Sequence, residues 1–271
     1  MSSSARRAAH GAKNSKAVQT LARAGFAASG VVHILIGIIA ISLAVGGGSG
    51  GGSADQSGAL QQLASAPGGV FLLWAAAAGL AALGLWHLLS AFLDRSTDSG
   101  SDRVKHIVKN AAKGVIYLAL AGTAGTIAAG GSASSSGSTR SLTADLLATP
   151  GGVFLVVAIG IGLLGVAGYL VFKGATRRFE RDLNLPSGTA GKVGRILGTV
   201  GYIARGVALA GVGVLFIIGG VTNDPEKSTG LDGALRSFAD LPAGMILLVV
   251  IGAGWIAYGI YAFYRARYTR L

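Results

Sequence analysis

Six long apolar runs, separated by polar segments, dominate the pattern of side chains along this chain. A helix of about 20 residues crosses the roughly 30 Å of hydrocarbon in a bilayer. Backbone amides in lipid must be hydrogen-bonded within the protein, so a run of this length is expected to be a helix. The pattern therefore predicts an all-α integral membrane protein with six transmembrane helices. The predicted spans are residues 24–45, 69–93, 107–130, 152–172, 196–221 and 243–264.

The composition favours a membrane protein over a soluble domain. Of the 271 residues, 51% are hydrophobic and 13% are charged, whereas soluble domains carry about 25% charged residues.

The chain contains no cysteine, which excludes disulfides, thiolate metal sites and a cysteine nucleophile. The first apolar run is longer than the roughly 7–15 residue core of a signal peptide, so we expect it to be retained as a helix.

Basic residues are distributed unevenly along the chain. All 23 Lys and Arg residues except Arg140, Lys227 and Arg236 lie before the first run, after the last run, or in and beside the second and fourth connections. The positive-inside rule then predicts that both termini are cytoplasmic in a bacterial plasma membrane. The net charge of +12 indicates this orientation and an attraction to anionic headgroups on the cytoplasmic side. No nucleic-acid partner is expected, because no soluble domain is present to read a groove.

An internal repeat organises the chain. The hexapeptide "PGGVFL" occurs at 67–72 and at 150–155, and "PAGMIL" takes its place at 242–247. The preceding helices align more weakly and share Gly30, Gly114 and Gly206. We therefore divide the chain into a basic N-terminal tail and three two-helix repeats. The tail is 1–17, and the repeats are 18–95, 104–181 and 193–271.

The repeats must be parallel. A unit with two spans returns to the side of the membrane where it began, so all three copies enter in the same direction. Such repeats are related about an axis along the membrane normal. The simplest arrangement is a pseudo-threefold bundle of six helices. Small residues four apart, such as Ala158 and Gly162, are typical of helices that pack tightly in a bilayer.

Each outer loop is predicted to contain a short surface helix before the repeated hexapeptide. Segments 46–56 and 130–140 are rich in glycine and serine and read as linkers. Apolar residues at helical spacing follow them, with Ser57, Ser141 and Asp232 as candidate N-caps. The proline and glycines of the hexapeptide then form a corner that sends the chain back into the membrane. An anion held at the three helix N-termini beyond these corners is the alternative interpretation.

These motifs carry a resemblance to a known family. The thrice-repeated unit, the "GYIARG" segment at 201–206, and the "PGG" or "PAG" corner before a glycine-aromatic helix resemble the bacterial membrane family catalogued as domain of unknown function 1206, common in actinobacteria. The resemblance covers nearly everything after about residue 18 and implies the same architecture. It supplies no activity, ligand or catalytic residue. The first copy departs from the family pattern, with Ser29 where the others have Lys113 and Arg205.

The polar residues within the spans offer little chemistry. None of the 11 acidic residues falls within a predicted span, although coupled transporters usually keep a carboxylate there. The four histidines are scattered, form no metal-ligand pair and belong to no catalytic motif. We therefore expect no enzyme activity, no cofactor and no metal. A membrane-embedded Ser/His pair involving His33 stays open as an alternative.

Five residues are singled out as a candidate polar pocket for an anionic lipid headgroup on the cytoplasmic side. They are Lys113, Arg205, His33, Tyr117 and Tyr202. The aromatic residues Trp86, Tyr169 and Tyr261 are expected to line the same pocket. The simpler alternatives are that the two cations extend to the membrane surface and that His33 only donates to the backbone of a neighbouring helix.

The preferred interpretation is a non-enzymatic scaffold, accessory subunit or lipid-interacting protein, with membrane lipids and a further membrane protein as partners. A passive channel or transporter for a small or lipid-like solute is one alternative. A membrane-embedded enzyme that modifies lipid is the other.

The predicted orientation can be tested directly, because a chain without cysteine accepts single-cysteine reporters. A membrane-impermeant maleimide applied to intact cells should label Ser138→Cys and should leave Ser187→Cys unlabelled until the membrane is permeabilised. The reverse pattern would contradict the orientation.

Overall fold

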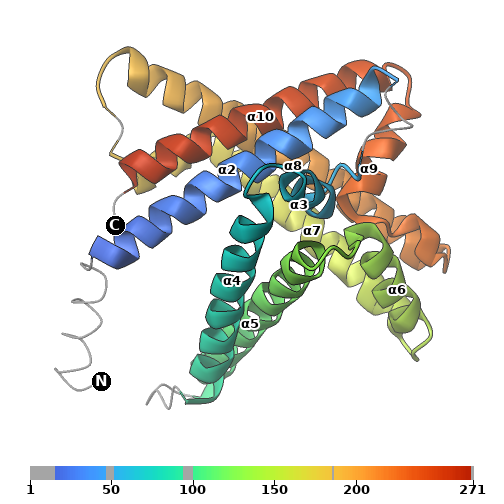
Figure 1. Cartoon of the computed structure of the whole chain (residues 1–271). Helices are drawn as coiled ribbons and strands as arrows, with labels where there is room; N and C mark the ends of the chain where they lie inside the picture. The colour runs from blue at the N-terminus through green and yellow to red at the C-terminus, as the bar shows by residue number, and fades with distance from the viewer. Residues whose placement is uncertain (1–15, 47–51, 94–99, 185, 270–271) are drawn as a thin grey trace. The chain divides into compact units, whose positions relative to one another are not determined.

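A computed structural model describes residues 16–46, 52–93, 100–184 and 186–269 (Figure 1). The described residues form helices and one isolated β-bridge, between Leu183 and Thr269. The all-α class is therefore confirmed. The predicted basic tail lies outside the described residues except for its last two positions, and the loop stretch 47–51 also lies outside them.

All six predicted spans are helices long and apolar enough to cross a membrane. Three of them, α2, α5 and α8, begin earlier than the apolar runs because polar helical turns continue beyond the hydrocarbon region. The six helices are α2 (Lys16–Ala44), α4 (Gly69–Leu93), α5 (Gly100–Ala128), α7 (Gly152–Ala175), α8 (Thr189–Val221) and α10 (Gly244–Tyr268).

The described helices fall into two compact units that cut across the sequence repeats. Unit 1 contains residues 60–133, with α4 and α5, and unit 2 contains the described residues up to 59 together with 134–269. The pseudo-threefold arrangement and the repeat boundaries therefore stay predictions.

Helices pair between repeats. In unit 1, α4 packs along α5; in unit 2, α7 packs along α8, α2 packs along α10, and α8 also crosses α10 (Figure 1). Each of the three long pairs joins the second span of one repeat to the first span of another. The third repeat packs against the first through α10 and α2. The compact units differ from the repeats because the long contacts lie between repeats.

Glycine brings the paired helices together. A methyl group added at Gly37 would lie 2.5 Å from the carbonyl oxygen of Gly252. One added at Gly160 would lie 2.8 Å from the carbonyl oxygen of Gly213. Lipid supplies no hydrophobic drive between helices, so the close backbone approach and the van der Waals contact it permits hold the pairs. Equivalent crossings join Gly30 to Gly259, Gly114 to Gly84, and Gly206 to Ala167.

The predicted four-residue spacing identified the wrong small residues. Gly162 has nothing within 4 Å of the position its Cβ would occupy, so it is not a crossing point. In unit 2 the crossings instead recur about two helical turns apart along α2, α7, α8 and α10, as in Gly30 and Gly37. A repeat of two turns keeps one face of a helix against the same neighbour.

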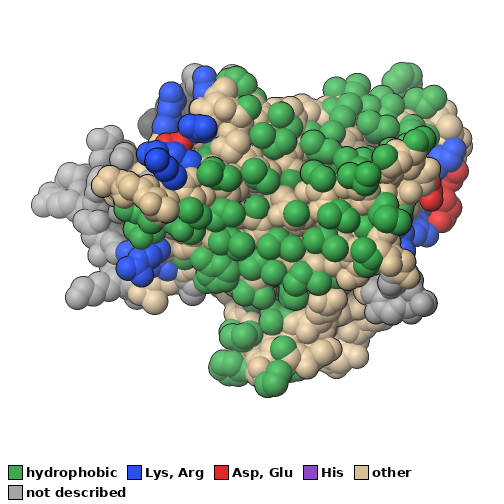
Figure 2. All heavy atoms as spheres, turned by 90° about the horizontal axis from the view of Figure 1, so that it is seen from above, with side chains coloured by type: hydrophobic (Ala, Val, Ile, Leu, Met, Phe, Trp, Pro, Cys, Tyr) green, Lys and Arg blue, Asp and Glu red, His purple; other side chains and the backbone are tan. Residues whose placement is uncertain are grey.

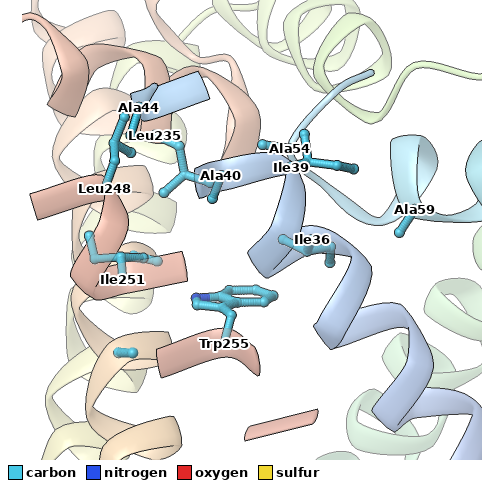
Figure 3. Packing of buried hydrophobic residues seen from close by; sticks show 12 residues of the cluster. Ile36, Ile39, Ala40, Ala44, Ala54, Ala59, Leu235, Leu248, Ile251 and Trp255 are labelled. Atoms are coloured by element: carbon cyan, nitrogen blue, oxygen red, sulfur yellow. The ribbon is translucent and has the colours of Figure 1, made fainter. Parts of the chain in front are cut away.

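Apolar cores fill the space around these crossings. In unit 2, Ile36, Ile39, Leu248 and Ile251 from α2 and α10 are fully buried (Figure 3). Leu235 from α9 (Gly230–Ala239) closes the same core. Unit 1 has its own cluster around buried Leu73 and Ile127. The core of unit 2 positions the rings described below.

The outer loops form the short helices that the pattern predicted: α3 (Gln56–Ala64), α6 (Ser135–Leu147) and α9. The predicted caps are wrong. Asp55 caps α3 by accepting hydrogen bonds from the Ser57 hydroxyl and a backbone amide, and Ser134 caps α6. Asp232 lies within α9 and bonds another segment instead. Spacing alone identified cap residue types but not the first helical turn.

Polar contacts within unit 2 tie the three outer segments to one another. Segment 130–140 was predicted to be a linker, but α6 begins at Ser135 because the cap and these contacts hold it. The contacts are the Ala54 amide to Asp232 at 2.8 Å, the Ser135 amide to the Ser57 hydroxyl at 3.2 Å, and the Arg140–Glu226 ion pair at 2.8 Å.

The opposite end of unit 2 gathers the α7–α8 connection and the end of α10. The Asn184 amide donates to the Tyr268 carbonyl at 2.8 Å.

Hydrophobic side chains cover the middle of the face in Figure 2, and charged side chains gather at its two ends. Large apolar residues after the repeated corners are exposed, such as Phe71 at 76% and Phe154 at 81%. This distribution is that of a protein in contact with lipid, and we describe it as an integral membrane protein.

Two neighbouring glycines of α7 test the crossing interpretation. Gly160→Ala should destabilise the protein by about 1–3 kcal/mol, because the new methyl would press on Gly213 and Ile217. Gly162→Ala is the matched control; it should leave stability unchanged or raise it by up to about 1 kcal/mol through helix propensity. Thermal unfolding in detergent measures both, and equal effects would contradict the interpretation.

Candidate functional site

A cluster of polar and aromatic side chains lies inside unit 2, where α2, α8 and α10 meet. The imidazole of His33 stacks on Trp255, with ring centroids 5.3 Å apart, and lies 4.8 Å from Tyr258. The guanidinium of Arg205 lies over the same two rings. We call these four residues the Arg205 cluster.

Local packing explains why these side chains meet. His33 lies between the two glycine crossings of α2, and Trp255 and Tyr258 lie between the matching crossings of α10. The backbones are therefore close enough for rings to stack across the interface. On the other side, Gly201 of α8 packs directly on the backbone of Tyr258, which places α8 beside the same ring.

His33 is buried and held by its own helix. Its Nδ1 lies 2.6 Å from the Ser29 carbonyl oxygen and 3.3 Å from the Ser29 hydroxyl. A carbonyl only accepts, so Nδ1 carries a proton and donates to it. In neutral His33 this leaves Nε2 as the acceptor. Ser29 is the residue that departs from the basic pattern of the other repeats, and here its backbone orients the imidazole.

Arg205 is half-buried within a membrane-spanning helix. Its guanidinium carbon lies 4.3 Å from the centroid of Tyr258 and 6.0 Å from that of Trp255. Cation–π contacts of this kind contribute about 0.5–2 kcal/mol. No carboxylate among the described residues pairs with Arg205. The buried indole N–H of Trp255 also has no hydrogen-bond partner within the described part of the chain.

The cluster continues into a second group of rings toward the α7–α8 connection. Tyr202 lies edge-on to Tyr258 at 5.4 Å and to Tyr261 at 5.8 Å, and Phe179 packs on both Tyr202 and Tyr261. The ammonium of Lys173 lies 5.1 Å from the Tyr202 centroid. A nearly continuous aromatic path therefore leads from the Arg205 cluster to the end of unit 2 that carries Lys173.

The structure brings together part of the predicted pocket. His33, Arg205 and Tyr202 meet in unit 2, and Tyr261 is buried beside them. Lys113 and Tyr117 belong to unit 1, where Lys113 is exposed and Tyr117 stacks on His87 at 5.5 Å. Their place relative to the Arg205 cluster stays a prediction.

Two other aromatic predictions have different outcomes. Tyr169 is 55% exposed and is not part of the ring cluster. The side chain of Trp86 lies outside the described residues.

Sequence reasoning missed Trp255 and Tyr258, although the repeat contains a signal for them. Aligned on the repeated corner, Trp255 stands where the other copies have Leu80 and Leu163. Tyr258 likewise stands where they have Leu83 and Val166. Aromatic residues at these two positions occur only in the third copy. A comparison between repeats that looked for differences would have found them.

The described residues contain no group of three His, Asp or Glu side chains that could hold a metal ion. The cluster instead offers donors: the guanidinium of Arg205 and the indole N–H of Trp255. Such donors bind an anion or an oxygen acceptor.

Comparison with known proteins assigns the chain to a family. The family described as Domain of Unknown Function (DUF1206) matches residues 24–94, 108–177 and 200–269. The chain belongs to this family. It is also 31% identical over 258 residues to the Uncharacterized protein YxxB of Bacillus subtilis (strain 168), with 94% of this chain and 92% of that protein covered. No solved structure matches the chain.

The three DUF1206 matches locate the cluster relative to the repeats. His33 lies in the first match, and Arg205, Trp255 and Tyr258 lie in the third. The cluster is therefore built where the last repeat packs against the first.

The stacking role of His33 can be separated from its hydrogen bond. His33→Ala should destabilise the protein by about 2 kcal/mol or more, because it leaves a cavity between Trp255 and Tyr258. His33→Phe keeps a ring in that space and should cost less. Thermal unfolding in detergent measures both. A wild-type midpoint for His33→Ala would show that the stack contributes nothing.

Proposed function

We propose that this DUF1206 protein is a non-enzymatic, multi-pass protein of the bacterial plasma membrane that binds an anionic lipid headgroup at the Arg205 cluster. Its termini are then cytoplasmic, as the basic residues predict. The observation that carries the proposal is the guanidinium of Arg205. Its side chain belongs to a spanning helix, and no carboxylate among the described residues pairs with it.

The physical argument begins with the charge of Arg205. A charged side chain in a membrane span is unfavourable unless it is paired or hydrated, and such residues usually mark functional sites. The rings of Tyr258 and Trp255 stabilise the guanidinium but do not neutralise it. A phosphate would neutralise it and can accept two parallel hydrogen bonds from its planar fork.

The indole of Trp255 supports the same ligand. A buried N–H without a partner loses hydrogen-bond energy, and its atom is buried here. An oxygen of a phosphate bound beside Arg205 would accept from it. The ligand class is therefore a phosphate-bearing anion, and the membrane location favours a lipid headgroup as its source.

The non-enzymatic part of the proposal is supported by the geometry of His33. A general base must accept a proton from its nucleophile, but Nδ1, the nitrogen nearest the Ser29 hydroxyl, donates to the Ser29 carbonyl. The pair of Ser29 and His33 is thus arranged to orient the imidazole, not to activate the hydroxyl.

Native mass spectrometry of protein released gently from its own membrane tests the proposal. Wild-type protein should retain an anionic phospholipid, and Arg205→Gln should reduce this retention about tenfold or more, as expected for a charged hydrogen bond. Trp255→Phe, which keeps the ring and removes the N–H, should give a smaller reduction. The adduct mass distinguishes a phospholipid from inorganic phosphate.

The matched control is Arg195→Gln. It removes an arginine from the same helix, but one whose guanidinium pairs with Glu180 at 3.2 Å, so lipid retention should match wild type. Equal retention in Arg205→Gln and wild type would reject the site, as would a wild-type protein that carries no anion.

A further inference from the structure

A groove on the surface of unit 2, separate in its lining from the Arg205 cluster, runs between α7 and α8. Its volume is about 590 Å³, within the range of about 300–1,000 Å³ typical of ligand sites. Every lining residue is apolar or glycine: Leu164, Ala167, Gly168, Val171, Phe172, Gly206, Val207 and Ala210.

The glycine crossing creates the floor of this groove. Gly206 lies against the carbonyl of Ala167 and the side chain of Val171, where a methyl group would come within 2.8 Å of the carbonyl oxygen. Gly168 faces open space, with nothing within 4 Å of its missing Cβ. The absence of a side chain at Gly168 therefore leaves the groove open.

The cationic side chain of Arg178 lies at one end of the groove. The guanidinium of Arg178 lies over the ring of Phe172, a lining residue, at 4.6 Å from its centroid. The turn that returns Arg178 to this ring passes through Arg177, whose φ is 53°, a left-handed conformation that residues other than glycine rarely adopt. Arg178 is exposed, so its donors remain available.

We propose that this groove binds an acyl chain of an anionic phospholipid whose phosphate pairs with Arg178. The lining from two spanning helices suits a hydrocarbon chain. Arg177 and Arg178 follow the last turn of α7, which contains Lys173, so positive charge gathers where the chain of a lipid joins its headgroup. A helix from a second copy would need no cation at this point. The inference does not depend on the Arg205 cluster.

The test uses phosphatidylglycerol with a photoactivatable group in its acyl chain, in vesicles of phosphatidylcholine. Cross-links in wild-type protein should map to 164–172 and 206–210. Gly168→Leu fills the groove and should reduce this labelling at least fivefold. Gly165→Leu is the matched control, since Gly165 lies on the same helix, faces open space and is not among the lining residues; it should label like wild type.

Two further measurements decide the headgroup and the occupant. Arg178→Gln should lower labelling by the phosphatidylglycerol probe and leave labelling by a matching diacylglycerol probe, which has no phosphate, unchanged, whereas equal labelling by both probes in wild type would reject the phosphate contact. Labelling unaffected by Gly168→Leu would overturn the groove. A dimer that Gly168→Leu dissociates would also overturn it, because a second copy would then fill the groove.

Failure of this inference is distinguishable from failure of the proposed function. Arg205→Gln should leave groove labelling at the wild-type level. Thermal unfolding of Gly168→Leu and Gly165→Leu should give equal midpoints, since neither new side chain meets an atom within 4 Å at its Cβ. Lower labelling in Gly168→Leu then reports loss of the groove and not loss of the fold.

Discussion

The close approach of helix backbones at small residues is the constraint on which the rest of this structure depends. Lipid supplies no hydrophobic drive between helices, so their association relies on van der Waals packing, which small residues favour by letting the backbones approach closely. The crossings at Gly37 with Gly252 and at Gly160 with Gly213 supply this contact. They join helices of different repeats, and the crossing of α2 with α10 joins the last repeat to the first. Packing between repeats therefore holds the repeats together.

The three helix pairs share a plan but differ in the polar and aromatic side chains that they bring together. The crossing between α2 and α10 holds His33 against Trp255 and Tyr258, whereas the other copies have aliphatic residues at the two α10 positions. A repeated framework thus leaves one interface free to diverge. The guanidinium of Arg205, which pairs with no carboxylate of the residues that the structure describes, enters that interface from α8. This combination of shared packing and local divergence is why we place the ligand there.

Both proposed lipid contacts in unit 2 follow from the same packing. At the Arg205 cluster, the small residue Gly201 lets α8 approach the ring of Tyr258. At the groove, Gly206 lets α8 approach α7, and Gly168 leaves the surface above them uncovered. Glycine in this DUF1206 protein therefore has two uses: it joins helices where backbones meet, and it opens space where lipid can lie.

The sequence by itself determined the six spans, the three repeats and the family, because hydrophobic length and internal similarity are local properties of the chain. It also identified Arg205, His33 and Tyr202, since polar residues are conspicuous in apolar spans. It did not reveal which helices pair, because glycines occur on several faces and only tertiary packing selects those that meet. The stacking of His33 on Trp255 and the cap at Asp55 likewise depended on contacts between distant segments or on the exact first turn of a helix, which no residue pattern specifies.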